Sequence, residues 1–335
     1  MKVNKQYVVF NYPDLCGLSY NKDGYYAICL EDLYNIENIK VVNYPLEGRN
    51  ILLKFAHKVF KSFEARGIFK EMCAKVLSAF YPLYFTSKIQ DQDNLCFVFV
   101  SDVWDMDYMR YLKKKYPNCK IVMALRDLVR TKWFYKQLKE ANLVDCWMSY
   151  DEGDCKEYNM HYFSEFESKI HISKNSKVEI SDVFFTGRAK DRLPKILEVY
   201  DRLTLLGLKC LFIILDAPES QQVKREGIVY TSQMMSYRKM LEYSINSKCL
   251  LDINQAGATG YTSRFLEAVI YNKLLLTNNS NIKNHPLYDE RYIKIFNSVE
   301  EISLSDFDFS DRVQYNYSNE FSPLFFISEV DKILS

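Results

Sequence analysis

The segment that decides the fold runs from Cys249 to Val269 and reads CLLDINQAGATGYTSRFLEAV. It begins as a short apolar strand at 250–253 and passes through a loop that contains Gly257 and Gly260. A helix follows, for which Thr262 is a suitable N-cap residue. A buried strand, a glycine-containing loop and a helix are typical of a βα unit in a parallel sheet. The segment therefore predicts an α/β domain.

The same alternation of apolar strand and helix recurs along the chain. Short apolar runs that can form strands lie at residues 7–10, 40–42, 97–100, 121–125, 146–148, 183–185, 211–215, 250–253 and 274–276. Helical stretches such as 191–206 and 236–246 lie between them. Continuous apolar strands of this kind suit a parallel sheet that is covered by helices on both faces.

Two domains fit both the length of the chain and the position of a polar break. A chain of 335 residues can build two α/β cores. The stretch between Phe163 and Ser181 is polar and lacks a sustained period, so we interpret it as an interdomain linker. We predict two Rossmann-like domains, 1–165 and 178–320, that face each other across a cleft. A C-terminal helix in 321–335 can pack back toward the N-terminal domain. Ligands of such sheets bind at the carboxyl ends of the strands.

Composition narrows the class of protein and its location. The 44 Lys and Arg residues balance 43 Asp and Glu residues, which leaves a net charge of +1 and no overall field that favours nucleic acid. The nine cysteines form no C-x-x-C pair, and several lie in apolar runs, as expected of thiols in a reducing compartment. No signal-peptide pattern and no run of ~18 apolar residues occurs. We expect a cytoplasmic protein.

Residues 52–80 form a basic amphipathic region, in which apolar side chains such as Phe55 and Phe69 alternate with lysines such as Lys54 and Lys70. Two interpretations remain open. The region can pack on the sheet with its lysines outward, or it can lie on an anionic membrane surface. The second would make the protein peripheral at the inner face of the cell membrane.

The helix after the glycine loop carries side chains suited to a nucleotide. Arg264, Glu267 and Tyr271 recur at i, i+3 and i+7 and are expected to share one face. A guanidinium can bind pyrophosphate oxygens as a fork, a carboxylate can accept both ribose hydroxyls, and free N–H groups at a helix start suit phosphate. The alternative is a surface helix that carries an inconsequential Arg264–Glu267 ion pair.

A second segment, 182–193, is a strand that ends in Gly187 and Arg188 and leads into another helix. Gly187 permits a close approach of the backbone to a ligand. Arg188, Lys190 and Arg192 supply positive charge for a diphosphate. The alternative is an ordinary βα turn with solvated charges.

Together the two segments resemble the nucleotide-binding domain of GT-B glycosyltransferases. The resemblance rests on F-F-T-G-R at 184–188 and on L-D-I-x-Q-x-G-x-T-G-x-T-x-R-x-x-E-A at 251–268. It covers residues 180–300 well and the N-terminal half only as a general pattern. It is strongest toward bacterial transferases that build capsule, lipopolysaccharide or exopolysaccharide repeat units.

The resemblance implies an enzyme that moves a sugar from a UDP-linked donor to a hydroxyl of a glycan or lipid-linked glycan. It places Glu267 on the ribose, Arg188 and Arg264 near the diphosphate, and the acceptor on the domain 1–165. The run 228–230 matches the family's strand before a uracil-contacting loop, here 233–237. The implied donor-binding residues are Gly187, Arg188, Arg192, Tyr230, Gly257, Thr259, Gly260, Thr262, Arg264 and Glu267.

One departure from the family pattern affects the chemistry. Many retaining members carry a second glutamate eight residues before the ribose-binding one, and here that position is Thr259. The stereochemical outcome therefore stays open. An inverting enzyme needs a general base on the acceptor side, for which Asp127 and Asp102, at predicted strand ends, are the candidates. Capping of a helix is the competing role for such residues. Further acidic residues in comparable positions are Asp14, Asp105 and Asp151.

No metal and no cofactor besides the nucleotide sugar are expected. Asp105 and Asp107 form a D-x-D motif, which holds a metal in another glycosyltransferase fold, but here it falls in a helical stretch and is attributed to chance. The four histidines are too far apart for a local metal site. Arginines and helix N–H groups would stabilise the leaving diphosphate instead.

Two other functions fit the same fold. A sugar-nucleotide epimerase would bind the same donor but would need several acid–base residues around the sugar. A catalytically silent glycan-assembly protein would keep the fold without binding the nucleotide.

Overall fold

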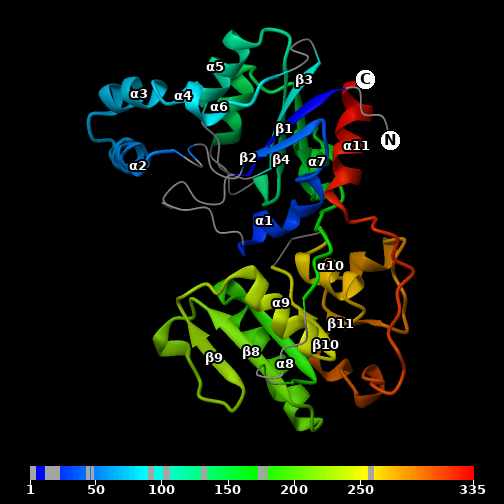
Figure 1. Ribbon diagram of the computed structural model, residues 1–335. Helices are drawn as coiled ribbons and strands as arrows, with labels where there is room; N and C mark the ends of the chain where they lie inside the picture. Colours follow the sequence, from blue (N-terminus) through cyan, green and yellow to red (C-terminus); the bar gives the residue numbers. More distant parts are fainter. Residues whose placement is uncertain are drawn as a thin grey trace. The chain divides into compact units, whose positions relative to one another are not determined.

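The computed structural model describes residues 5–11, 23–42, 46, 49–89, 94–100, 106–129, 134–172, 178, 180–255 and 260–335. The chain divides into two compact units (Figure 1). The N-terminal unit comprises Met1–Ser168 and Ser322–Ser335, and the C-terminal unit comprises Lys169–Phe321. Each unit contains one six-stranded sheet.

The sheet of the N-terminal unit is parallel throughout. Its strands, in order across the sheet, are β2 (Ile39–Val42), β1 (Gln6–Phe10), β3 (Leu95–Phe99), β4 (Lys120–Leu125), β5 (Cys146–Ser149) and β6 (His161–Tyr162). Successive side chains of β1 enter opposite cores, Tyr7 and Val9 on one face and Val8 and Phe10 on the other. This two-sided burial explains why these strands are continuous apolar runs in the sequence.

Helices cover both faces of this sheet. They are α1 (Tyr25–Cys29), η1 (Glu31–Leu33), α2 (Ile51–Ala65), α3 (Lys70–Ser78), α4 (Tyr81–Tyr84), α5 (Met106–Lys115), α6 (Phe134–Ala141), α7 (Glu152–Tyr158) and α11 (Pro323–Leu334). Although α11 ends the chain, its Phe326, Ile327 and Val330 are buried in the same core as Tyr7. The Tyr7 hydroxyl also donates a hydrogen bond to Asp331 at 2.8 Å.

The sheet of the C-terminal unit is parallel as well. Its strands, in order, are β12 (Ile293–Ile295), β11 (Leu274–Thr277), β10 (Cys249–Asp252), β7 (Val183–Arg188), β8 (Cys210–Leu215) and β9 (Ile228–Thr231). Its helices are η3 (Lys190–Arg192), α8 (Leu193–Leu205), η4 (Glu219–Gln221), α9 (Tyr237–Asn246), α10 (Ser263–Ile270), η5 (Ser280–Asn284), η6 (Val299–Glu301) and η7 (Leu304–Asp306). The strand order reverses at β7 and β10, where doubly wound sheets bind ligands.

The start of the predicted linker lies inside the N-terminal unit. Residues 165–168 are buried. Within this stretch, Glu165 accepts a 2.5 Å hydrogen bond from Nε of Arg126. The Arg126 side chain is 1% exposed, and its Nη2 also donates to the carbonyl of Phe166 at 3.1 Å and to the hydroxyl of Tyr25 at 2.8 Å. Burial raises the pKa of Tyr25 well above its ordinary value. The division between the two units falls after Ser168, within the predicted linker, but the first residues of that stretch are buried in the N-terminal unit.

The prediction of two α/β cores with parallel sheets is confirmed, since each predicted apolar run lies in or next to a strand. Two strands were missed. β6 has only two residues, both exposed, and β12 has three with Lys294 at its centre, so neither shows an apolar run. Within the described part of the chain, no helix is long and apolar enough to cross a bilayer, and the eight cysteines placed there are free thiols.

Candidate functional site

The candidate site lies at the carboxyl edge of the C-terminal sheet. Because the strands are parallel, their last residues meet at one edge. Residues at or just after these strand ends are Arg188 (β7), Asp216 (β8), Gln233 (β9), Asn254 (β10) and Asn278 (β11). The two sequence segments that resembled a nucleotide site, one around β7 and one around β10, therefore lie beside each other.

Gly187 leaves room for the side chain of Arg192. A Cβ atom at position 187 would lie 3.0 Å from Nη2 of Arg192 and 3.2 Å from Cζ of Phe185. The Arg192 guanidinium donates to the carbonyl of Arg188 at 3.2 Å and to the carbonyl of Ile253. Burial lowers its pKa, and neighbouring carboxylates act in the opposite direction. Arg192 thus joins the turn after β7 to the end of β10.

Arg188 lies on the exposed rim of this edge. Its guanidinium pairs with Asp216, and the two side chains are 51% and 40% exposed. Its Nη2 lies 3.6 Å from Sδ of Met234. An exposed ion pair contributes only ~0–1 kcal/mol, so an anionic ligand can compete for the guanidinium.

A pocket of about 420 Å³ opens at the ends of β8 and β9. It is lined by Asp216, Ala217, Glu219, Gln222, Tyr230, Thr231, Ser232 and Gln233. The Tyr230 hydroxyl accepts a hydrogen bond from the N–H of Val223 at 3.1 Å and donates to its carbonyl at 3.2 Å, which holds the ring in place. The pocket combines an aromatic side chain with amide and hydroxyl groups, which suits a flat polar group.

Arg264 and Glu267 form a buried ion pair, with side chains 8% and 0% exposed. Both carboxylate oxygens accept hydrogen bonds: Oε1 from the Tyr237 hydroxyl at 2.9 Å, and Oε2 from the Ser244 hydroxyl at 3.0 Å and from Arg264. Burial raises the pKa of Glu267, and the guanidinium opposes that shift. The shared face predicted for the pair is confirmed, and the alternative of a surface helix is wrong because α10 is buried along its length.

Sequence reasoning missed the two hydroxyls that complete this network. The sequence pattern places Tyr237 only in a base-contacting loop and predicts no role for Ser244. Both lie on α9, seven residues apart, so two turns of helix place them on one face. That spacing was the available signal, but it becomes informative only when α9 is known to lie against α10.

Asp252 is a second buried carboxylate at the edge, 6% exposed at the end of β10. The Thr277 hydroxyl donates to it at 3.1 Å. Burial raises the pKa of Asp252, whereas hydrogen bonds from Thr277 and Thr262 lower it. Thr262 also caps α10, as predicted, by accepting a hydrogen bond from the N–H of Phe265.

Asn254 follows β10 and carries a buried side-chain amide. Its backbone N–H donates to Oδ1 of Asn278 at 2.8 Å. Its own Oδ1 and Nδ2 are both buried, and neither has a hydrogen-bond partner in the described part of the chain. Leaving a buried polar group unsatisfied costs ~1–3 kcal/mol. Such a group calls for an explanation, and a polar ligand bound at this edge is one.

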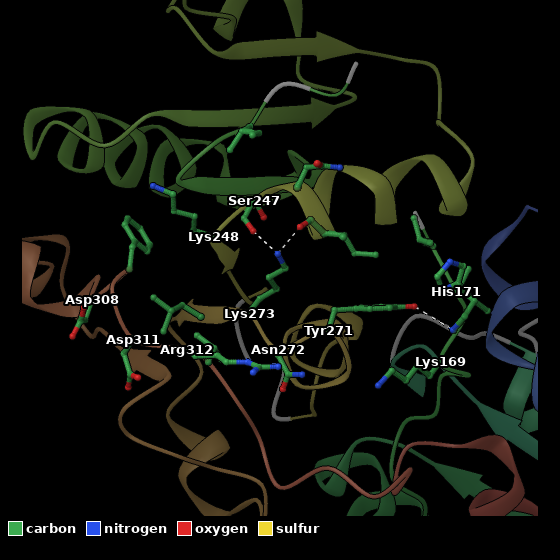
Figure 2. Close-up of a pocket in the computed structure, with 18 residues that line it drawn as sticks. Lys169, His171, Ser247, Lys248, Tyr271, Asn272, Lys273, Asp308, Asp311 and Arg312 are labelled. Carbon is green, nitrogen blue, oxygen red and sulfur yellow. Dashed lines mark hydrogen bonds between the residues drawn. The ribbon is translucent and has the colours of Figure 1, made fainter. Parts of the chain in front are cut away.

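Tyr271 does not join Arg264 and Glu267, contrary to the i+7 prediction. The helix ends at Ile270, and Tyr271 lies at the opposite edge of the sheet. There it lines a second pocket of about 720 Å³, shown in Figure 2, and its hydroxyl accepts a hydrogen bond from the N–H of Ile170 at 3.4 Å. Seven residues span ~10 Å along a helix axis, enough to leave the site.

Two of the cations that line this second pocket, Lys273 and Lys248, already have protein partners. Figure 2 shows Lys273 directed at carbonyl groups near the end of α9, with Nζ donating to Ile245 at 2.5 Å and to Ser247 at 2.7 Å. Lys248 forms an ion pair with Asp182 at 2.7 Å. None of the described residues that the sequence predicts for the donor lines this second pocket, so the amino edge does not match the predicted nucleotide site.

His285 lies in an aromatic cluster. Its ring packs edge-on against Tyr261 at 4.7 Å and Phe265 at 4.8 Å between centroids. Its Nδ1 accepts a hydrogen bond from the N–H of Leu287 at 3.1 Å. Burial lowers the pKa of His285 to about 4. It is a packed, neutral side chain at neutral pH.

In the N-terminal unit, Asp127 follows β4 and is exposed. Its Oδ1 accepts a hydrogen bond from the N–H of Leu128 at 3.0 Å. Asp151 is a helix cap, the role that competes with that of a general base. It caps α7 by accepting a hydrogen bond from the N–H of Asp154 at 3.0 Å. The remaining candidates Asp102, Asp14 and Asp105 lie outside the described residues, as do Gly257 and Thr259 in the donor loop.

The second aspartate of the D-x-D motif, Asp107, lies in the first turn of α5 and pairs with Arg110 at 2.6 Å. This helical position agrees with the interpretation of the motif as a chance match. Among the residues that the structure describes, no three His, Cys, Asp or Glu side chains are grouped so that they could hold a metal ion.

No protein-family model matches the sequence, and no curated protein matches it. Solved structures do match the fold. HepE from Anabaena, in complex with UDP and glucose, is 11% identical, with 98% of this chain and 99% of that chain covered and a TM-score of 0.55. An α-glucosyltransferase, in complex with UDP and a 13-mer DNA containing a central A:G mismatch, is 11% identical, with coverages of 98% and 99% and a TM-score of 0.54.

The chain has the GT-B fold. At these identities the similarity establishes the fold, and the predicted class of two Rossmann-like domains is confirmed. A putative UDP-N-acetylglucosamine 2-epimerase from Listeria monocytogenes is 8% identical, with coverages of 99% and 97% and a TM-score of 0.48.

Proposed function

We propose that this GT-B protein is a glycosyltransferase that moves a sugar from a UDP-linked donor to a hydroxyl of a glycan or lipid-linked glycan. The observation that carries the proposal is the carboxyl edge of the C-terminal sheet. There the Asn254 amide, which has no hydrogen-bond partner among the described residues, follows the strand that leads to the buried Arg264–Glu267 pair. The two solved structures with TM-scores of 0.55 and 0.54 hold UDP in this fold, which supports the nucleotide.

Each part of the donor has a proposed place at this edge. The base occupies the 420 Å³ pocket beside Tyr230. The diphosphate lies between Arg188 and the start of α10 at Gly260 and Thr262, where helix N–H groups and the guanidinium meet its charge. Gly187 and Arg192 hold the turn after β7 in place. Gly257 and Thr259, which precede α10 in the sequence, are proposed to contact the donor as well.

Glu267 is proposed to bind the ribose. Among the described residues its Oε1 accepts a single hydrogen bond, from Tyr237, and a carboxylate oxygen can accept a second. A ribose hydroxyl would supply that second hydrogen bond. Arg264 pairs with the carboxylate, which orients it and opposes the rise in its pKa that burial causes.

For the acceptor side, we propose Asp127 as the general base, with Asp102 as the alternative. The Asp127 carboxylate is exposed at the carboxyl edge of the N-terminal sheet, where it can take the proton of an acceptor hydroxyl. Asp127→Asn should then lower kcat by ~10²–10⁴-fold and leave UDP binding unchanged. A variant with full activity would exclude Asp127 as the base.

The biological role proposed for this reaction is the assembly of a bacterial surface polysaccharide at the cytoplasmic face of the membrane. The support is the sequence pattern at 184–188 and 251–268. The transferred sugar and the acceptor are to be identified by a screen of sugar nucleotides for donor-dependent hydrolysis and transfer.

The test of the donor site is thermal stabilisation by UDP in the full chain and in two matched variants. Glu267→Ala and Glu165→Ala each remove a buried carboxylate that is paired with an arginine, at 0% and 6% exposure. Breaking a buried pair costs ~3–5 kcal/mol, so both variants should melt at lower temperature. UDP at a hundredfold excess over Kd adds ~2.7 kcal/mol to a protein with an intact site.

Only Glu267→Ala should lose the UDP-induced shift, measured against its own baseline. Glu165 lies in the N-terminal unit, so Glu165→Ala should keep the UDP-induced shift. Equal shifts in both variants would remove Glu267 from the site, and no shift in the unmodified protein would favour a silent assembly protein. Conversion of one UDP-sugar into its epimer, with no sugar passed to an acceptor, would favour epimerase chemistry.

A further inference from the structure

Eight large apolar side chains are exposed on α2, α3 and the turn between them: Ile51, Leu52, Leu53, Phe55, Phe63, Ile68, Phe69 and Met72. We call these eight residues the α2–α3 apolar surface. Ile51, Leu52 and Phe69 are exposed by 78%, 72% and 71%. Scattered apolar residues are normal on protein surfaces, but a contiguous exposed patch marks an interaction site.

The opposite face of the two helices already packs on the N-terminal core. His57 of α2 is 5% exposed and shares a 2.5 Å hydrogen bond with the hydroxyl of Tyr84. Its ring lies edge-on to Phe80 at 5.3 Å between centroids. On α3, Cys73 and Leu77 are fully buried. The α2–α3 apolar surface is therefore additional to the face that folding uses, and Figure 1 shows the two helices at one end of their unit.

Four of the five exposed apolar residues of α2 follow helical spacing, and Leu53 lies outside their stripe. Ile51, Leu52, Phe55 and Phe63 fall within one stripe of the helix, since 51, 55 and 52 lie on adjoining positions and 63 follows 55 by about two turns. At the turn, Phe69 has a φ of +46°. Bulky side chains rarely adopt this left-handed conformation. The backbone thus places an aromatic ring in solvent at an energetic cost.

The charge around this surface identifies its partner. Residues 51–80 contain six Lys or Arg residues and two Glu residues, a net charge of +4 when histidine is neutral. The whole chain has a net charge of +1, so the remainder carries −3. Arg66, Lys70 and Lys75 are exposed beside the apolar residues. Two copies of this surface would repel each other, whereas a bilayer with anionic headgroups offers both an apolar interior and negative charge.

We propose that the α2–α3 apolar surface docks on an anionic lipid bilayer. Phe55 and Phe69 enter the boundary between headgroups and acyl chains, and the neighbouring basic side chains contact the lipid phosphates. This docking goes beyond the proposed sugar transfer and does not depend on the donor site. It would place the enzyme at the surface where a lipid-linked acceptor is located.

The first test is co-sedimentation of the full-length protein with vesicles of phosphatidylcholine alone or of equal parts phosphatidylcholine and phosphatidylglycerol. We expect binding to the anionic vesicles only. The variant Phe55→Ser with Phe69→Ser should weaken that binding by at least ~10-fold, because it removes both inserted rings. The matched control is Leu205→Ser, which removes a side chain that is 79% exposed elsewhere and should bind as the unmodified protein does.

The second test separates charge from apolar contact. Lys70→Glu with Lys75→Glu should weaken binding by about fivefold or more for each lysine changed. Lys114→Glu with Lys224→Glu makes the same change in net charge at exposed positions outside this surface and should have a smaller effect. Equal losses in the two pairs would show that only overall charge matters, which would overturn the proposed surface.

A fluorescent reporter in the turn between α2 and α3 provides a test that does not depend on the folding of the serine variant. Phe69→Trp should show a blue shift of fluorescence on addition of anionic vesicles, and none with phosphatidylcholine alone. Absence of a shift, or vesicle binding that survives the serine variant, contradicts the proposal. So does sedimentation velocity that shows a dimer broken by Phe55→Ser with Phe69→Ser. UDP-induced stabilisation should be unchanged in all these variants, so failure of docking can be told from failure of the donor site.

Discussion

Glu267 shows how much one buried carboxylate constrains its surroundings. With 0% exposure, its charge is tolerated only because Arg264, Tyr237 and Ser244 all donate to it. Three helix-borne donors around one acceptor make the orientation of Arg264 specific. A guanidinium whose orientation is fixed in this way is well suited to bind a negatively charged ligand in one defined geometry.

His285 gives the stability a pH dependence whose direction follows from its burial. Its pKa falls to about 4 in the folded protein, from an ordinary value of 6.5. As the pH falls through this window, the unfolded chain takes up a proton that the folded chain does not, so the free energy of unfolding decreases. Above the ordinary pKa the residue contributes nothing to pH dependence.

We expect His285→Phe, which keeps a ring between Tyr261 and Phe265, to lose less stability between about pH 7 and about pH 4.5 than the unmodified protein does. The difference should be ~2 kcal/mol after allowance for partial exposure. Urea unfolding at the two pH values measures it. Identical pH dependence of the two proteins would show that His285 is protonated as readily in the folded state as in the unfolded chain.

At the scale of elements, α10 connects the two edges of the C-terminal sheet. Its N-terminal half brings Arg264 and Glu267 close to Asp252, whereas Tyr271, just past its end, lies in the pocket of Figure 2. Periodicity along the helix predicted that all three residues share one face. The end of the helix at Ile270 and the rise along its axis separate the third from the first two.

The C-terminal helix α11 belongs to the N-terminal unit, although it lies at the far end of the chain. Phe326 is 3% exposed in its core, and the adjacent Phe325 is 52% exposed. Phe326→Ala should destabilise the protein by ~3–5 kcal/mol, because it leaves a cavity against the sheet. Phe325→Ala should change stability by about 1 kcal/mol or less. Chemical denaturation of both variants checks this, and equal effects would mean that α11 does not pack as described.

At the scale of the whole molecule, the two units have separate cores and separate sheets. The candidate donor residues with described positions all belong to the C-terminal unit, and Asp127 belongs to the N-terminal one. A ligand of the donor site should therefore stabilise the C-terminal unit first. This division also makes it possible to damage one unit and test the binding function of the other, as the paired glutamate variants do.

We expect sugar transfer to proceed without a bound metal ion, because guanidinium groups and helix N–H groups can meet the charge of the leaving diphosphate. Addition of EDTA should leave the rate unchanged. Arg188→Ala should lower it by ~10–100-fold, since one charge-assisted contact is lost. A rate that collapses in EDTA and returns with Mg²⁺ would contradict this mechanism.

Local sequence determined all strands except β6 and β12, the helices 191–206 and 236–246, and the N-cap at Thr262, because apolar periodicity and capping act over a few residues. It also indicated that the turns in the segments 182–193 and 249–269 belong to one site, since both turns follow buried parallel strands. Only the tertiary structure decided which side chains meet. The contacts of Glu267 with Tyr237, of Arg126 with Glu165 and of α11 with the first sheet join residues far apart in the chain, and no local pattern encodes such distances.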